Sequence, residues 1–160
     1  MKLHQTIAFM LIMMACTSQN LLAGGPKVFL NPGVKFGYSF GEKGGFMYGL
    51  EVSITSTFSD SFSPFWAGFV FTTTKRKGKH SIHYGAQASY LGFGMEVGPT
   101  YVNDYGKMYS GYSVTSFGGL IIIPYYTYSR FDNDSLTSHE IGSYIKMPLQ
   151  VMGERFRLSQ

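Results

Sequence analysis

The segment Gly45–Thr57 (GFMYGLEVSITST) has a large apolar residue at every second position. These residues are Phe46, Tyr48, Leu50, Val52 and Ile54. A period of two places them on one face of a β-strand and the mostly small or polar residues between them on the other. The outer face of a strand in a soluble protein is normally polar. An apolar, aromatic face opposite a small, polar one is instead what a membrane barrel needs, because one face meets lipid and the other a narrow lumen.

The same alternation recurs along the chain and predicts eight strands. We expect them at about 27–40, 45–57, 64–74, 80–90, 93–102, 109–117, 120–130 and 138–149. Because every connection is short, consecutive strands should pair as antiparallel hairpins. The expected fold class is all-β, an eight-stranded antiparallel up-and-down transmembrane β-barrel preceded by a signal peptide. The phases of the sixth and seventh strands stay open, because the seventh (LIIIPYYTYSR) begins apolar on both faces.

Charge distribution and composition agree with this prediction. The apolar faces of the first five predicted strands carry no Asp, Glu, Lys or Arg. A charge there would cost about 2–4 kcal/mol at the bilayer midplane. Only 14% of the residues are charged, whereas 44% are hydrophobic, so the chain could cover little surface with charge. After the N-terminal segment, no run approaches the ~20 apolar residues of a membrane helix, and a closed barrel is the other way to satisfy backbone hydrogen bonds in lipid.

The first 23 residues have the layout of a secretory signal. Lys2 precedes the apolar run 7–15 (IAFMLIMMA), which is too short to span a bilayer. We expect cleavage after Ala23, which assigns residues 24–160 to the barrel. Cys16 is the only cysteine, so no internal disulfide can form; residues 13–16 also resemble a lipobox, which leaves lipidation of Cys16 open. Cleavage would leave 12 basic and 9 acidic residues, a net charge of +3, too small to indicate a nucleic-acid partner.

Six ionisable residues on the small-residue faces are candidates for ion pairs in the lumen. They are Lys35, Glu51, His83, Glu96, Glu140 and Lys146. Side chains just fill an eight-stranded barrel, and ionised groups inside it must pair or be hydrated. A turn centred near Lys43 would place Lys35 opposite Glu51, so we predict that pair. These residues therefore predict a plug of ion pairs.

One basic cluster stands out in the predicted loop 75–79. It consists of Lys75, Arg76, Lys77 and Lys79. We predict that it faces the anionic phosphates of lipopolysaccharide; a solvated loop tip is the simpler alternative. The histidines lack the spacing of metal ligands, and no glycine-rich loop precedes a helix. We therefore expect no metal and no cofactor.

The segments GVKFGYSFG, MYGLEVS and GMEVGPTY share a rhythm of glycines and aromatic residues. In this and in its architecture the chain resembles small bacterial outer-membrane barrels, of the type of the outer membrane protein A membrane domain and outer membrane protein X. The resemblance implies a monomer in the outer membrane of a Gram-negative bacterium, with outer-membrane lipid, lipopolysaccharide and the barrel-assembly machinery as partners. Family members often end on an aromatic residue, whereas Phe156 is followed here by four more residues. Residues 150–160 are therefore a candidate periplasmic tail.

Three functions fit the sequence. The first is a structural or surface-interaction barrel with a filled, non-conducting lumen and no enzymatic activity. The second is a soluble periplasmic barrel that binds an apolar ligand, which would turn the Phe/Tyr face inwards. The third is an outer-membrane hydrolase that modifies lipid A through Ser81, His83 and an acid, although a turn at 91–92 places Glu96 opposite Gln87 and not opposite His83.

Overall fold

The computed structural model describes residues 27–40, 44–57, 65–119, 121–132 and 137–152. The predicted signal peptide (1–23), the predicted turn near residue 60 and residues 153–160 of the predicted tail lie outside this part of the chain. All regular elements of the described residues are β-strands. Within the same residues, no helix has the length and apolarity needed to cross a membrane.

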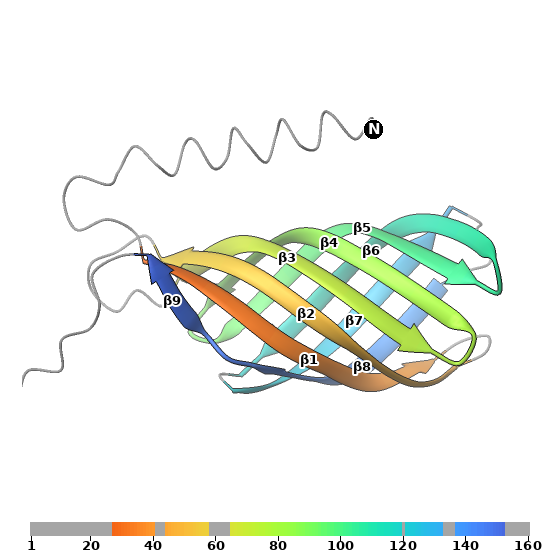
Figure 1. Cartoon of the computed structure of the whole chain (residues 1–160), viewed down its shortest axis with the longest axis horizontal. Coiled ribbons are helices and arrows are strands. Elements are labelled where there is room, and N and C mark those ends of the chain that lie inside the picture. Colours follow the sequence, from red (N-terminus) through yellow and green to blue (C-terminus); the bar gives the residue numbers. More distant parts are fainter. Residues whose placement is uncertain (1–26, 41–43, 58–64, 120, 133–136, 153–160) are drawn as a thin grey trace, which may run out of the picture.

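The strands form one closed antiparallel barrel (Figure 1). From β1 to β8 each strand pairs with the next, and β1 pairs with both β2 and β8, which closes the wall. The short β9 follows β8 in the chain and also pairs with β1. β8 and β9 therefore share one position beside β1, and the wall has eight strand positions. The predicted eight-stranded up-and-down barrel is confirmed. The strands are β1 (Val28–Phe40), β2 (Gly45–Thr57), β3 (Phe65–Arg76), β4 (Lys79–Tyr90), β5 (Phe93–Asp104), β6 (Lys107–Gly118), β7 (Ile122–Phe131), β8 (Thr137–Lys146) and β9 (Leu149–Met152).

Met147 and Pro148 separate β8 from β9, whereas the sequence alternation predicted a single strand over 138–149. Proline has no N–H for a strand ladder, and the ladder breaks at this point. Met147 keeps the closure intact, because its backbone N–H donates to the carbonyl oxygen of Pro32 in β1 at 3.1 Å. β9 then pairs with the first residues of β1, so residues 150–152 belong to the barrel wall.

The barrel has two ends that differ in their connections. At the terminal end, β1 begins, β9 finishes and the turn Leu91-Gly92 lies; at the hairpin end lie the turns Lys77-Gly78 and Tyr105-Gly106 (Figure 1). Leu91-Gly92 and Tyr105-Gly106 have positive φ at both residues, which is typical of the tight type I′ hairpin. The predicted loops 75–79 and 103–108 are therefore mostly strand, and only two residues turn in each.

The two faces of the wall confirm the predicted alternation. Among the described residues, 29 large hydrophobic side chains are exposed. Six hydrophobic side chains are buried, against 19 polar or charged ones. The structure also fixes the phase of β7, in which Ile123, Tyr125 and Thr127 point inwards while the residues between them are exposed. A soluble domain has the opposite distribution.

Trp66 corrects one expectation about the aromatic residues near the terminal end. In the sequence, Phe62, Phe65 and Trp66 cluster at one end of a predicted strand, where we expect an outer aromatic belt; Phe62 lies outside the described residues. Neighbours in a strand face opposite sides, and only Phe65 is on the exposed outer wall. The Trp66 ring packs against Phe29, with 4.7 Å between ring centroids, and these two rings fill the terminal end of the lumen.

Candidate functional site: a charged lumen and a basic rim

Two lysine–glutamate pairs lie on the inner wall, among strands β8, β1 and β2. Lys35 Nζ lies 3.3 Å from Glu140 Oε2, and Lys146 forms an ion pair with Glu51. The predicted Lys35–Glu51 pair is wrong. The β1–β2 register is centred on residue 42 rather than 43, so Lys35 lies opposite Gly49. Because this shift moves the pairing by two residues, both side chains stay on the inner face, and only their partners change.

Gly33 explains how Lys146 reaches Glu51 across an intervening strand. Gly33 of β1 pairs with Lys146 on one side and with Glu51 on the other, so the three residues form one row. A Cβ on Gly33 would approach Lys146 Cγ to 2.9 Å. The lysine side chain therefore passes over the glycine. Glu51 is only 1% exposed, and its other oxygen accepts a hydrogen bond from the Thr72 hydroxyl at 3.5 Å.

Two tyrosine rings fill the bore beside these pairs. Tyr125 and Tyr144 are buried, with 4.5 Å between their ring centroids. Lys35 Nζ lies 4.5 Å from the Tyr125 centroid, and Lys146 Nζ lies 4.6 Å from the Tyr144 centroid. These distances are those of cation–π contacts. The rings therefore both occupy space and partly compensate the lysine charges.

His83 and Glu96 occupy the opposite side of the lumen. The predicted register is confirmed, since Glu96 pairs with Gln87. His83 Nε2 nevertheless lies 3.8 Å from Glu96 Oε1, although Thr100, the ladder partner of His83, is four residues away from Glu96. Tyr144 donates its hydroxyl to the same oxygen at 3.5 Å. The six predicted lumen residues thus lie on the inner wall, in two lysine pairs and one histidine–glutamate contact.

A chain of hydroxyl groups extends from His83 around the wall. His83 Nδ1 is 2.9 Å from Thr100 Oγ1, which is 2.6 Å from Ser113 Oγ. Ser113 is in turn 2.7 Å from Ser129 Oγ. Ser81, the nucleophile of the hydrolase alternative, is hydrogen-bonded to Thr74. Its hydroxyl and the His83 ring therefore have separate partners, and all of these groups face the lumen.

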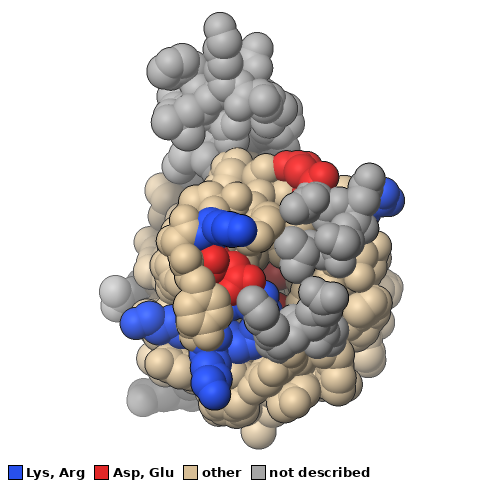
Figure 2. Space-filling model, turned by 90° about the vertical axis from the view of Figure 1, so that its right-hand side faces the viewer, with Lys and Arg blue, Asp and Glu red and all other residues tan. Residues whose placement is uncertain are grey.

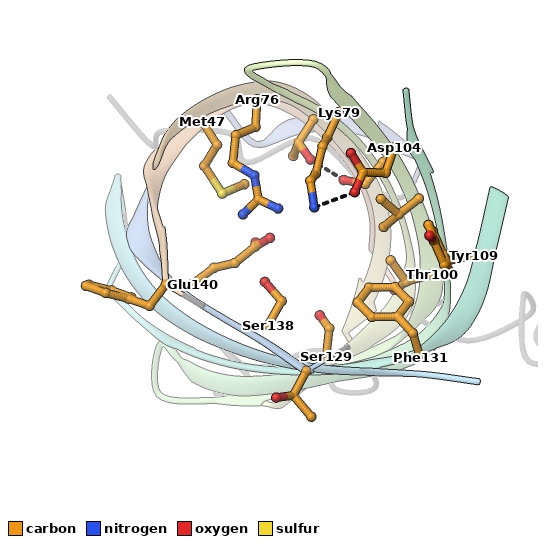
Figure 3. A pocket seen from close by; sticks show the side chains of 15 residues that line it. Met47, Arg76, Lys79, Thr100, Asp104, Tyr109, Ser129, Phe131, Ser138 and Glu140 are labelled. Atoms are coloured by element: carbon orange, nitrogen blue, oxygen red, sulfur yellow. Dashed lines mark hydrogen bonds and ion pairs between the residues drawn. The ribbon is translucent and has the colours of Figure 1, made fainter. Parts of the chain in front are cut away.

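The hairpin end opens into a small mouth (Figure 3). Lys79 Nζ forms an ion pair with Asp104 Oδ2 at 2.9 Å, while Arg76 and Glu140 also project into the opening. The mouth cavity has a volume of about 50 Å³, and a neighbouring cavity beside Lys35 and Glu96 has about 20 Å³. One water needs roughly 10–15 Å³ of such space. The two cavities therefore have room for a few waters.

The basic cluster predicted as one loop is divided among three places. Arg76 and Lys79 line the mouth, Lys77 is exposed in the turn, and Lys75 is exposed on the outer wall. Viewed from the hairpin end, basic side chains gather along one side of the rim, next to acidic groups in the opening (Figure 2). The alternation of residues along the strand already predicts which of these side chains face the lumen. Arg76 continues the inner set of Thr72 and Thr74.

Asp104 is a mouth residue that the sequence prediction missed. The sequence feature that could have revealed it is Tyr105-Gly106, because a glycine at the second position of a two-residue connection indicates a tight hairpin. That turn extends β5 to Asp104 and places it opposite Lys79 in the ladder.

The arrangement as a whole places paired charges and aromatic rings in the described interior of the barrel. Among the described residues, no group of three or more His, Cys, Asp or Glu could hold a metal ion. No family model matches the chain, and neither does a curated protein or a solved structure.

Proposed function

We propose that this protein is a small barrel of the bacterial outer membrane, with a structural or surface-interaction role and a lumen that does not conduct ions. One observation carries the proposal: the described outer wall is apolar and the described interior is polar. Closure removes the free strand edges that lipid would not tolerate. An apolar outer wall around a closed ladder is what contact with acyl chains requires.

The position of outward charges supports a membrane boundary near the hairpin end. By strand alternation, only two charged side chains of the described strands point outwards, Lys75 and Arg130. Each is the last residue but one of its strand at the hairpin end. A charge costs about 2–4 kcal/mol at the midplane but about 0–1 kcal/mol near an interface. The outer wall between the two ends is thus free of charge in the described strands.

Outward aromatic residues lie towards both ends of the wall. Tyr38 pairs with Phe46 near the hairpin end, and Tyr90 pairs with both Phe65 and Phe93 near the terminal end. These rings are exposed. Aromatic girdles at two levels are typical of barrels that span a bilayer, because such rings favour the interfaces.

The two alternatives find less support in the geometry. A periplasmic carrier of an apolar ligand needs the Phe/Tyr face inside, but that face is outside. A hydrolase acting on lipid needs its nucleophile within reach of the substrate, whereas Ser81 and His83 point into the lumen. We retain the structural or surface-interaction barrel as the proposed function.

Cysteine labelling of Val52 and Ser53 tests the membrane proposal. These neighbours face lipid and lumen, respectively. After reconstitution in vesicles, we expect Val52→Cys to react with a membrane-soluble maleimide and not with a charged one, because acyl chains cover it. Ser53→Cys should react with neither, because it is buried. Rapid labelling of Val52→Cys by the charged reagent, with the protein extracted by carbonate, would show an outer wall in water.

A planar bilayer recording tests the sealed lumen. We expect no stable conductance steps from the refolded protein, because the two cavities found in its described interior have room for only a few waters. A porin in the same bilayer is the positive control, and a mobility shift on heating in a detergent gel confirms that the barrel is folded. Reproducible open levels from folded protein would contradict the sealed lumen and leave the membrane location unaffected.

A further inference from the structure

A groove on the outside of the hairpin end combines basic and aromatic side chains. It lies between β2, the β3–β4 hairpin and the β5–β6 turn, and its volume is about 560 Å³. This is within the ~300–1,000 Å³ range of small-ligand sites. The described residues that line it include no aspartate or glutamate, so their charged groups all have the same sign.

The strand register builds the floor of this groove. Tyr48, Lys75, His80 and Asn103 pair successively across β2, β3, β4 and β5, and therefore form one row on the outer wall. Side chains at such paired positions are neighbours, with Cβ atoms about 4.5–5.5 Å apart. Lys75 thus has Tyr48 as its neighbour on one side and His80 on the other. The ring of His80 is held against the wall by Thr73, with 2.8 Å between Nε2 and Oγ1.

The two hairpin turns form the outer wall of the groove. The backbone N–H of Tyr105 donates to the carbonyl oxygen of Gly78 at 3.2 Å, which joins the turns. The Tyr105 ring occupies the space that a side chain at Gly78 would need. Lys77, in the same turn as Gly78, is exposed beside it. The groove is therefore bounded by a backbone contact and a packed ring.

All four cations of the hairpin line the groove, but Arg76 and Lys79 also line the mouth. Lys79 is neutralised inside the mouth by Asp104. Lys75 and Lys77 form no ion pair with any residue of the described chain. Two ammonium groups therefore face the groove without a counter-charge from the described residues. Both line it together with His80 and Tyr105.

We propose that this groove binds a phosphate group carried by a membrane glycolipid, through Lys75 and Lys77. The inference rests on the proposed function, because the groove must lie at the level of lipid headgroups. Ammonium groups donate strong, charge-assisted hydrogen bonds to phosphate oxygens. The groove is larger than one phosphate, and the flat faces of Tyr48 and Tyr105 can cover the sugar that carries it. Tyrosines at this level are typical of the headgroup region.

Lipid titration of the folded barrel in detergent micelles, followed by native mass spectrometry, tests this site. The probes are bisphosphorylated lipid A, the same lipid without phosphates, and inorganic phosphate as a competitor. We expect binding of the phosphorylated lipid only. The double variant Lys75→Gln/Lys77→Gln should bind it roughly 30-fold more weakly, which corresponds to about 1 kcal/mol for each charge. Lys75→Arg/Lys77→Arg should retain binding.

A charge-matched control separates the groove from general attraction. Lys107→Gln/Arg130→Gln removes two charges from the same end of the barrel but none from the groove, and should leave the affinity unchanged. Equal losses in both double variants would overturn the site, as would equal binding of the dephosphorylated lipid. Displacement of lipid A by inorganic phosphate at similar concentration would show a simple anion site and overturn the glycolipid assignment. None of these results would affect membrane insertion, which the labelling of Val52→Cys measures separately.

Discussion

Replacing Lys146 by methionine should lower the free energy of unfolding in lipid vesicles by about 3–5 kcal/mol, the cost of leaving a buried charge without its partner. In the structure, Lys146 pairs with Glu51, which is 1% exposed and whose other carboxylate oxygen accepts a hydrogen bond from the Thr72 hydroxyl. Water cannot easily reach this carboxylate, so its charge would remain uncompensated. Urea titration followed by tryptophan fluorescence gives the value, since Trp66 is the only tryptophan.

A second variant tests whether the loss arises from the pair itself. Glu51→Gln/Lys146→Met removes both charges, and we expect it to recover most of the lost stability, because replacing a whole buried pair is often close to neutral. Lys35→Met tests the pairing between strands. It should lower stability by leaving Glu140 without its partner, and Glu51→Gln should not restore that stability. Rescue of Lys35→Met by Glu51→Gln alone would contradict the observed pairing and favour the pairing predicted from sequence.

Replacing Val52 by arginine should destabilise the membrane-inserted barrel by about 2–4 kcal/mol, because the side chain would enter the centre of the apolar wall. Val52 lies near the middle of β2 and is exposed on the outer face, paired with Pro32 and Phe71. In water, an arginine at such an exposed position would cost little. The loss of unfolding free energy in vesicles therefore shows whether lipid or water surrounds this face.

Tyr48→Arg is the matched control for depth. It lies on the same face of the same strand, but in the row of Lys75 near the hairpin end, where a charge should cost about 0–1 kcal/mol. Equal effects of the two substitutions would argue against a bilayer around the wall. A large effect of Val52→Arg that persists after transfer to a detergent-free aqueous buffer would also argue against it, since no lipid would then be present.

The alternation of residue types predicted much of this structure correctly. Each of the residues Phe46, Leu50 and Ile54 faces outwards, and Glu51 between them faces inwards, because the side-chain period of a strand is two whatever its partner. Short connections with glycine then left an up-and-down order as the simplest topology. The inner location of Lys35, Glu96 and Lys146 follows from the same local rule, as does the tight turn at Leu91-Gly92.

The sequence by itself therefore determined which side of the wall each of these residues occupies, and the tertiary structure decided which residues meet. A register shift of two leaves every face unchanged but exchanges the partner of Glu51 from Lys35 to Lys146. The path of Lys146 depends on Gly33 lying between the two strands, and the row of Tyr48, Lys75 and His80 exists only when three strands are aligned. Local periodicity cannot supply these contacts, because they depend on how distant segments slide along one another before the barrel closes.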